Sequence, residues 1–327
     1  MDRVGVIGCG KMGFKHMDCF RRIPGVKVVG VFDTNTQKCN ECGGVKHYDT
    51  VADLFKDCDI VDICTPTNTH KDYIMEGIKL KKAIFVEKPL CRTMEEANAI
   101  LKEAKKKKAK IMVGHILRYF NQYANIKRLV DTKAAGKPCV VRISRVNGFR
   151  RGSNNWFSSL EKSGGVILDL MIHDIDFLMW CFGDVERVYA MNLMSKGVQN
   201  TDYALAVLRF KNGVIAHLEA SWAHYSGFRT SVEMACDKGL ISYDSRNPNT
   251  LAVEFAGGRN FKDSPVDENA TLVELKDFIN YTRSGKIPKL DIDDAYGCLE
   301  VSLAALESTK TGKVVTIKKA NSKLKYK

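Results

Sequence analysis

The sequence predicts an α/β protein of two domains: a doubly wound parallel sheet, followed by an α+β domain with a large open, mainly antiparallel sheet. Three observations predict this. The chain has 327 residues, about twice the roughly 150 residues of a typical domain. Its N-terminal third alternates short β-branched runs with longer helical stretches, whereas later β-branched runs follow one another with few helices between them. We expect the domains to span residues 1–119 and 120–327.

The first predicted domain should form a parallel sheet covered by crossover helices on both faces. Its apolar runs lack the alternation of half-exposed strands, as expected when both faces are buried. Each crossover should be right-handed. We expect strands at residues 4–7, 26–32, 60–64, 83–86 and 110–113, and helices at residues 11–22, 51–55, 69–81 and 94–107.

The C-terminal half should form a mainly antiparallel sheet with a few long helices. Turn signals such as Lys211-Asn212-Gly213 and Asp237-Lys238-Gly239 join neighbouring strands. We expect strands at residues 139–146, 187–192, 204–210, 214–220, 230–235, 240–244 and 251–255, and helices at residues 123–132, 164–181, 268–284 and 291–311. Because no linker rich in Pro, Gly or Ser separates the halves, we expect them to touch, with a cleft where they meet.

Composition narrows the functional classes. Apolar residues make up 45% of the chain and charged residues 27%, which is ordinary for a globular protein and excludes disordered or collagen-like classes. The longest apolar run is far shorter than the roughly 20 residues that span a bilayer, and the N-terminus leads into a strand rather than a signal peptide. The 11 scattered cysteines favour reduced thiols, so we expect a cytoplasmic protein.

The charge distribution and the cysteine spacing indicate neither a nucleic-acid or membrane partner nor a metal site. The net charge of +13 favours anionic ligands or solubility. Its densest run, the lysines at residues 105–108, ends a predicted helix, where cations are favourable, so we expect neither a nucleic-acid nor a membrane partner. Cys39 and Cys42 form a C-x-x-C pair without a second pair at metal-binding spacing, and we predict no metal site.

The clearest motif is a Gly-x-Gly-x-x-Gly fingerprint, Gly8-Cys9-Gly10-Lys11-Met12-Gly13. It follows the first predicted strand and opens the first predicted helix, the context in which the fingerprint binds a dinucleotide. Its glycines allow a tight turn, close approach of the backbone to a pyrophosphate, and close packing of helix on strand, while Lys11 and Met12 begin the helix that faces the phosphates. Asp33 ends the second strand, where a carboxylate suits the ribose hydroxyls and repels a 2′-phosphate. We predict a Rossmann domain that binds NAD, with NADP as the less favoured alternative.

The third predicted strand should end at the same edge of the sheet, where ligands bind in open α/β folds. There we expect cofactor contacts from Thr65, Pro66, Asn68 and His70. Two alternatives remain open, because Asn68 or Thr69 can cap the following helix and His70 is equally consistent with capping.

The fourth predicted strand ends in Glu87-Lys88-Pro89. A lysine fixed by a rigid strand and a proline would be held near the nicotinamide, and we also count Glu87 among the cofactor contacts. The alternative is a surface ion pair between Glu87 and Lys88, which is common at strand ends.

A second group of polar residues lies on the helix predicted at residues 164–181. Asp169 and His173 are four residues apart and Asp176 follows three later, so these side chains should share one face of a regular helix. Leu168, Ile172 and Ile175 should form the packing stripe. A carboxylate one turn from an imidazole can orient it, and histidine moves protons well near neutral pH.

With these motifs together, the chain resembles the Gfo/Idh/MocA family of NAD(P)-dependent sugar and polyol dehydrogenases. The resemblance continues to the closing segments Asp293-Asp294-Ala295 and Gly312-Lys313-Val314. It implies that Lys88 is the catalytic lysine, Asp169 the substrate-binding aspartate and His173 the catalytic histidine. It also implies a sheet through which the protein forms a homodimer or homotetramer.

Weaker candidates for substrate binding come from the same comparison and from the predicted second domain. Arg118 belongs to an Arg-aromatic pair typical of the family, although Asn121 stands where many members have proline. Residues that could line the cleft are Asn155, Trp156, Trp222, His224 and Tyr225, of which Trp222 and Tyr225 are equally suited to sheet packing. Side chains that could bind an anionic substrate, or be solvated, are Arg145, Arg150, Arg151 and Arg229.

These features favour an NAD-dependent dehydrogenase that oxidises a secondary hydroxyl of a cyclic polyol or sugar, similar to myo-inositol 2-dehydrogenases. One alternative is a UDP-N-acetylglucosamine 3-dehydrogenase or a related nucleotide-sugar oxidoreductase. Another, of a different class, is a non-catalytic regulator that senses NAD and sugar, because a fold alone does not fix function.

Overall fold

The computed structural model describes residues 1–149, 152–194, 197, 201–247, 251–256, 258, 260–263 and 268–317. It divides into two compact units. The first comprises Met1–Ile116 and Asn269–Tyr296, and the second comprises Leu117–Glu268 and Gly297–Lys327. Each unit has its own sheet.

The first unit contains a five-stranded parallel sheet with the strand order β2-β1-β3-β4-β5. Its strands are β1 (Asp2–Ile7), β2 (Val26–Phe32), β3 (Ile60–Ile63), β4 (Ala83–Glu87) and β5 (Ile111–Gly114). Every residue of β3 and β5 is buried, as expected for central strands of a parallel sheet that helices cover on both faces. The chain order reverses between β1 and β3, which is where ligands bind in open α/β sheets. The predicted doubly wound arrangement is confirmed.

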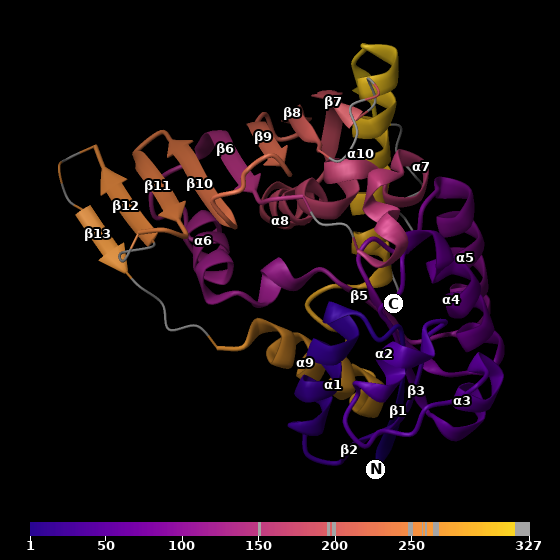
Figure 1. Cartoon of the computed structure of the whole chain (residues 1–327). Coiled ribbons are helices and arrows are strands. Elements are labelled where there is room, and N and C mark those ends of the chain that lie inside the picture. Colours follow the sequence, from indigo (N-terminus) through magenta and orange to yellow (C-terminus); the bar gives the residue numbers. More distant parts are fainter. Residues whose placement is uncertain are drawn as a thin grey trace. The chain divides into compact units, whose positions relative to one another are not determined.

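Helices cover both faces of this sheet (Figure 1). They are α1 (Lys11–Arg21), α2 (Thr36–Asn40), α3 (Val51–Asp57), the 3-10 turn η1 (Thr67–Thr69), α4 (His70–Lys79) and α5 (Met94–Lys107). Local capping explains where several begin: Thr50 caps α3, and Thr93 and Glu96 form a capping box at the start of α5. The sequence pattern missed α2, a helix of 5 residues that is too short to show a helical period.

The segment Asn269–Tyr296 belongs to the first unit, although the sequence pattern assigned all of residues 120–327 to the second domain. Its helix α9 (Ala270–Ser284) packs against α1. The ring of Phe278 meets that of Phe85 at 5.4 Å, and Arg283 Nε donates to Asp2 Oδ2 at 2.8 Å. A return of the chain to an earlier unit leaves no local signal in the sequence.

The second unit contains a nine-stranded sheet with the order β13-β12-β11-β10-β6-β9-β8-β7-β14. Its strands are β6 (Pro138–Val146), β7 (Val185–Asn192), β8 (Tyr203–Phe210), β9 (Ile215–Ser221), β10 (Arg229–Cys236), β11 (Gly239–Asp244), β12 (Leu251–Phe255), β13 (Asn260–Asp263) and β14 (Val315–Thr316). β6 and β9 pair in parallel, whereas the other strand pairs described in this sheet are antiparallel. The predicted open, mainly antiparallel sheet is confirmed.

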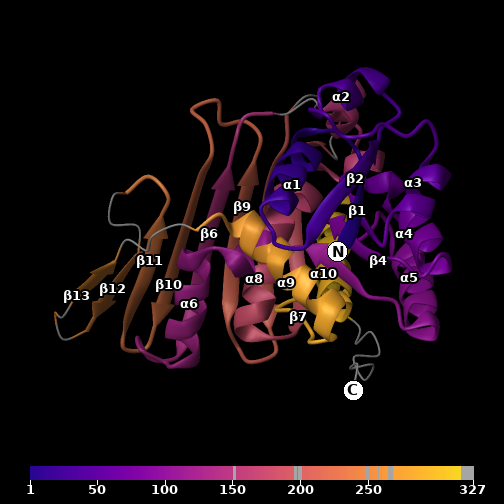
Figure 2. The same ribbon diagram turned by 90° about the horizontal axis from the view of Figure 1, so that it is seen from below.

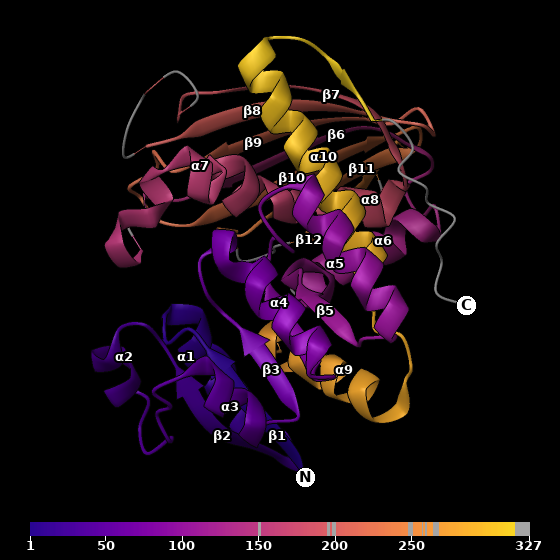
Figure 3. The same ribbon diagram turned by 90° about the vertical axis from the view of Figure 1, so that its right-hand side faces the viewer.

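Helices of the second unit lie across one face of this sheet (Figures 2 and 3). They include α6 (Asn121–Asp131), α8 (Ile172–Phe182) and the later part of α10 (Ile292–Thr311). Shorter helical segments precede α8: η3 (Ser153–Ser158), α7 (Leu160–Ser163) and the π-helix η4 (Ile167–Met171). None of the helices in the described part of the chain has the length and apolar character needed to cross a membrane.

Candidate active site

The glycine loop after β1 has the shape that a dinucleotide requires. Gly8 has φ +100°, and a Cβ there would lie 2.6 Å from the Cys64 carbonyl oxygen. A Cβ on Gly13 would lie 2.0 Å from the Gly8 carbonyl oxygen, whereas a Cβ on Gly10 would meet nothing within 4 Å. The first and third glycines therefore keep strand and helix in contact, and the second leaves open space at the N-terminus of α1. Lys11 and Met12 form the first turn of that helix, so these residues fit a pyrophosphate.

Asp33, just beyond β2, holds this loop in place. Its Oδ2 accepts a hydrogen bond from the Cys9 amide at 2.7 Å, and its Oδ1 accepts one from the Asn35 amide at 2.8 Å. A carboxylate has about four lone-pair directions, so these contacts leave acceptor capacity for a ribose hydroxyl. The side chain is half-buried, as a residue shared by loop and ligand would be.

His70 connects two strand ends. Its imidazole is buried, with Nδ1 2.8 Å from the Pro89 carbonyl oxygen and Nε2 2.9 Å from the Thr65 carbonyl oxygen. Burial lowers the pKa of His70, so the ring is neutral at pH 7 and donates to one of these carbonyls at a time. The sequence left His70 open between capping and cofactor contact, and the structure shows a bridge between the loops after β3 and β4. Half-buried Pro66 and exposed Asn68 lie on the first of these loops.

Lys88 follows β4 directly and is half-buried. Its amide donates to the Glu87 side chain, with 3.2 Å between Lys88 N and Glu87 Oε2. The other carboxylate oxygen, Oε1, lies 3.3 Å from Nε2 of His16, which is fully buried and also contacts Asp62. Glu87 is therefore part of an internal network and not one half of a surface ion pair. Sequence reasoning missed His16 and Asp62, although a carboxylate in the middle of the apolar run at residues 60–63 signals a buried partner.

Asp169 and His173 lie at the junction of two kinds of helix in the second unit. Asp169 belongs to the π-helix η4 and His173 to the first turn of α8, and both side chains are half-buried. Leu168, Ile172 and Ile175 are fully buried, as the predicted packing stripe requires. Single-turn π segments inside helices are frequent at functional sites, and no sequence pattern in this chain predicts one.

Trp222 holds the Asp169 carboxylate. Its indole Nε1 donates to Asp169 Oδ2 at 3.1 Å. The side chain follows β9, is only 1% exposed, and packs edge-on against the rings of Phe149 and Phe157. The sequence left Trp222 open between cleft lining and sheet packing. The structure combines packing with support of Asp169.

Asp176, which the helical period groups with Asp169 and His173, is more deeply buried than those two side chains. Asp176 is buried and forms a two-pronged ion pair with Arg118, with Nε–Oδ2 3.0 Å and Nη2–Oδ1 2.7 Å. The π-helix has i→i+5 bonds, so residues on either side of it do not follow the 3.6-residue period. Because its guanidinium is buried on Asp176, Arg118 is assigned to the support of α8.

A second buried pair anchors the same helix. Arg145 on β6 binds Asp174, with Nε–Oδ2 2.8 Å and Nη2–Oδ1 2.7 Å, and also donates to the Tyr123 hydroxyl at 2.8 Å. Arg229 pairs with Asp244 at 2.7 Å. Both arginines are thus engaged by carboxylates, whereas Arg150 and Arg151 lie outside the described residues.

The remaining weak candidates are more exposed. Asn155 has φ 52° and donates to the Ser158 hydroxyl at 3.0 Å, and the Trp156 ring stacks on Phe157 with centroids 4.0 Å apart. His224 lies 3.0 Å from the Ser221 hydroxyl. Tyr225 is 82% exposed, so it does not pack in the sheet.

Family models and known proteins match most of this chain. Residues 3–115 match the family model of the oxidoreductase family with an NAD-binding Rossmann fold, and residues 123–242 match the GFO/IDH/MocA C-terminal domain. The chain is 30% identical to scyllo-inositol 2-dehydrogenase (NAD(+)) of Bacillus subtilis over 96% of both chains. It is 28% identical to myo-inositol 2-dehydrogenase of Thermotoga maritima, covering 94% of this chain and 96% of that protein.

A solved structure extends the comparison. UDP-N-acetylglucosamine 3-dehydrogenase of Acidithiobacillus ferrooxidans superposes with a TM-score of 0.82 at 26% identity, covering 94% of this chain and 98% of that one. The glycine loop with Asp33, the Glu87-Lys88 strand end and the Asp169/His173 helix all fall within the matched regions. The chain therefore belongs to the GFO/IDH/MocA oxidoreductase family, and residues 3–115 form its NAD-binding Rossmann fold.

Proposed function

We propose that this protein is an NAD-dependent dehydrogenase that oxidises a secondary hydroxyl of a cyclic polyol or free sugar of the inositol type. The observation that carries the proposal is the Asp169 carboxylate, held through one oxygen by Trp222 close in sequence to His173. A carboxylate fixed in this way can accept a hydrogen bond from a polyol hydroxyl. Relatives named as inositol 2-dehydrogenases support the same substrate class.

Each proposed site residue has a distinct task. His173 accepts the proton of the substrate hydroxyl, a role that suits an imidazole near neutral pH. Asp169 grips a neighbouring hydroxyl, and Lys88 donates a hydrogen bond to the oxygen as negative charge develops on it. NAD, when bound, supplies the two-electron acceptor. The glycine loop and Asp33 bind and orient its phosphates and adenosine ribose.

A nucleotide-sugar 3-dehydrogenase is the second candidate, favoured by the similarity to the Acidithiobacillus ferrooxidans enzyme. A diphosphate needs cationic partners, and Arg145 and Arg229 already bind Asp174 and Asp244. This engagement favours an uncharged polyol. A non-catalytic sensor of NAD and sugar is disfavoured because Lys88, Asp169 and His173 are all retained.

A substrate panel distinguishes the three functions. NADH formation, followed at 340 nm, is measured with inositols, free sugars and UDP-sugars, using the wild-type protein and His173→Ala. We expect turnover with a cyclic polyol and its loss in His173→Ala, with NAD binding retained. Turnover confined to UDP-sugars would select the second function. Binding of NAD and sugar without turnover would select the sensor.

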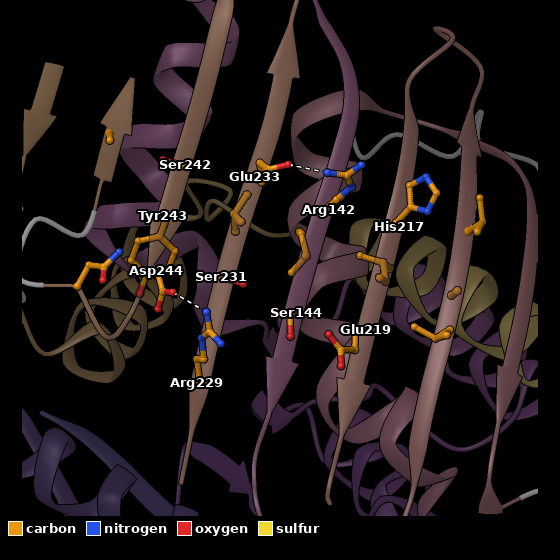
Figure 4. A pocket seen from close by; sticks show the side chains of 18 of the residues that line it. Arg142, Ser144, His217, Glu219, Arg229, Ser231, Glu233, Ser242, Tyr243 and Asp244 are labelled. Atoms are coloured by element: carbon orange, nitrogen blue, oxygen red, sulfur yellow. Dashed lines mark hydrogen bonds and ion pairs between the residues drawn. The ribbon is translucent and has the colours of Figure 1, made fainter. Parts of the chain in front are cut away.

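We also propose that the open face of the nine-stranded sheet joins two copies of the chain. Figure 4 shows this face, where polar side chains such as Arg142, Glu219 and Glu233 lie on neighbouring strands. Beside them Met191, Leu205 and Val207 are exposed, and Met191 and Leu205 are directly opposite each other on β7 and β8. An apolar patch rimmed by charge is typical of a protein interface. A cytoplasmic homo-oligomer fits these features and the free thiols.

Light scattering coupled to size exclusion tests this interface. Met191 is 53% exposed, and Met191→Glu should shift the protein from dimer or tetramer toward smaller species at micromolar concentration. Ile287, in the first unit, is 52% exposed, and Ile287→Glu is the matched control that should leave the mass unchanged. A wild-type monomer, or equal effects of both substitutions, would contradict the proposed interface.

A further inference from the structure

A buried group of charges lies behind Lys88, and the proposed reaction does not use it. His16 comes from α1, Asp62 from the middle of β3 and Glu87 from the end of β4. The His16 and Asp62 side chains are fully buried, and the Glu87 side chain is 14% exposed. The rings of His16 and Phe85 meet edge-on at 5.5 Å, so one wall of the group is apolar. Burying such charges is costly unless they neutralise one another, and apolar side chains would fill the same space at lower cost. We therefore expect this group to have a role other than packing.

His16 lies between the two carboxylates. Its Nδ1 is 3.1 Å from each Asp62 carboxylate oxygen, and its Nε2 is 3.3 Å from Glu87 Oε1. The Nε2 contact is an ion-pair contact without the alignment of a hydrogen bond. Because both ring nitrogens face carboxylate oxygens, this geometry suits an imidazolium with a proton on each. Burial opposes that charge, but the Asp62 carboxylate, 3.1 Å away, helps to raise the pKa of His16 well above its ordinary value.

Glu87 connects His16 to the backbone of Lys88. Its Oε2 accepts the Lys88 amide at 3.2 Å while Oε1 faces His16. On the far side of the lysine, the Pro89 carbonyl lies 2.8 Å from Nδ1 of buried His70. The backbone that carries Lys88 is thus held from both directions by a buried imidazole, through Glu87 before it and through Pro89 after it.

We propose that the buried Asp62–His16–Glu87 chain is a positioning device for Lys88, a role that rests on the proposed dehydrogenase function. His16 acts through Glu87 and is a positioning residue. Without its cation, the Glu87 carboxylate would be free to turn away from the Lys88 amide toward other cations. A displacement of about 1 Å at a reacting group can cost roughly 100-fold in rate, so a residue remote from the substrate can limit turnover.

Two variants separate positioning from loss of core packing. His16→Gln keeps a donor near Asp62 but removes both the charge and the ring nitrogen that faces Glu87. Cys64→Ala removes a thiol that lies 3.6 Å from Asp62 and 3.3 Å from His16 Nδ1, in the same group, and leaves the His16–Glu87 contact in place. Equal effects of both variants would indicate only a loosened core.

Hydrogen exchange measured by mass spectrometry tests the proposal without any turnover. The peptide that contains Lys88 should exchange about tenfold faster in His16→Gln than in the wild type, because the Lys88 amide loses its fixed acceptor. The same peptide in Cys64→Ala should exchange at the wild-type rate. Unchanged exchange in His16→Gln, or the same acceleration in Cys64→Ala, overturns the positioning role.

Kinetics then test whether His16 acts through Lys88. His16→Gln should lower kcat by about tenfold or more while the KM for NAD changes by less than about threefold. In a Lys88→Met background, the same substitution should change kcat by less than about twofold, because residues that act as a unit are not additive. Multiplicative losses overturn the proposal. If the wild type turns over none of the substrates, the proposed function fails, and hydrogen exchange alone decides the positioning role.

Discussion

Lys88→Met should lower kcat by about 100-fold or more, the loss expected when one donor to a developing oxyanion is removed. Methionine keeps much of the length of the lysine side chain but cannot donate a hydrogen bond. NAD binding should be retained, because the glycine loop and Asp33, which are proposed to bind its phosphates and adenosine ribose, are unchanged. The measurements are kcat with the substrate found in the panel and the dissociation constant of NADH from fluorescence titration.

Lys79→Met is the control for removing a lysine. Lys79 ends α4, its side chain is 72% exposed, and its ion pair with Glu76 is a surface pair of little energetic weight. We expect the kcat of Lys79→Met to remain within about twofold of the wild-type value. If Lys88→Met also turned over at nearly the wild-type rate, Lys88 would have no catalytic role. The Glu87-Lys88-Pro89 segment would then serve only to join β4 to the following loop.

The fold was largely predictable because its signals are local. The apolar run at residues 83–86 lacks alternation, and it forms β4, whose residues Ile84, Phe85 and Val86 are buried in the parallel sheet. The β-branched and apolar run at residues 204–210 forms β8, in which burial alternates: Ala204, Ala206 and Leu208 are buried and Leu205 and Val207 are exposed. The placement of Asn269–Tyr296 in the first unit depends on contacts with residues far away in the sequence, which periodicity cannot report.

The motifs of the candidate site could be predicted from the sequence, but the residues that hold Lys88 and Asp169 in place could not. The glycine loop and Asp33 follow from spacing and from the strand that precedes each. The π-helix η4, by contrast, has no sequence signature here, and neither does the pairing of Asp176 with Arg118. The supports of Lys88 and Asp169 are His16 and Trp222, residues distant in sequence whose roles depend on the packing of separate elements.

Arg145→Met should destabilise the second unit by about 3–5 kcal/mol, the usual cost of leaving one member of a buried ion pair without its partner. Both side chains of the Arg145–Asp174 pair are nearly inaccessible to solvent. Arg145 also donates a hydrogen bond to the Tyr123 hydroxyl, which the substitution would remove. Burial already raises the pKa of the Asp174 carboxyl, and loss of the guanidinium should raise it further. The variant's deficit should therefore be smaller at pH 5 than at pH 8, because the stranded carboxyl takes up a proton as the pH falls.

Denaturant unfolding monitored by tryptophan fluorescence measures this change, since Trp156, Trp180 and Trp222 all lie in the second unit. Lys211→Met is the control: Lys211 also belongs to the second unit, but its ion pair with Asp184 is exposed and should be worth about 1 kcal/mol or less. Arg145→Met combined with Asp174→Leu should recover most of the loss, because no unpaired charge remains buried. If the single and double variants were equally unstable, shape and packing at Arg145, and not the stranded carboxylate, would account for the loss. The support of α8 would then be steric, and the pH dependence of the single variant should vanish with it.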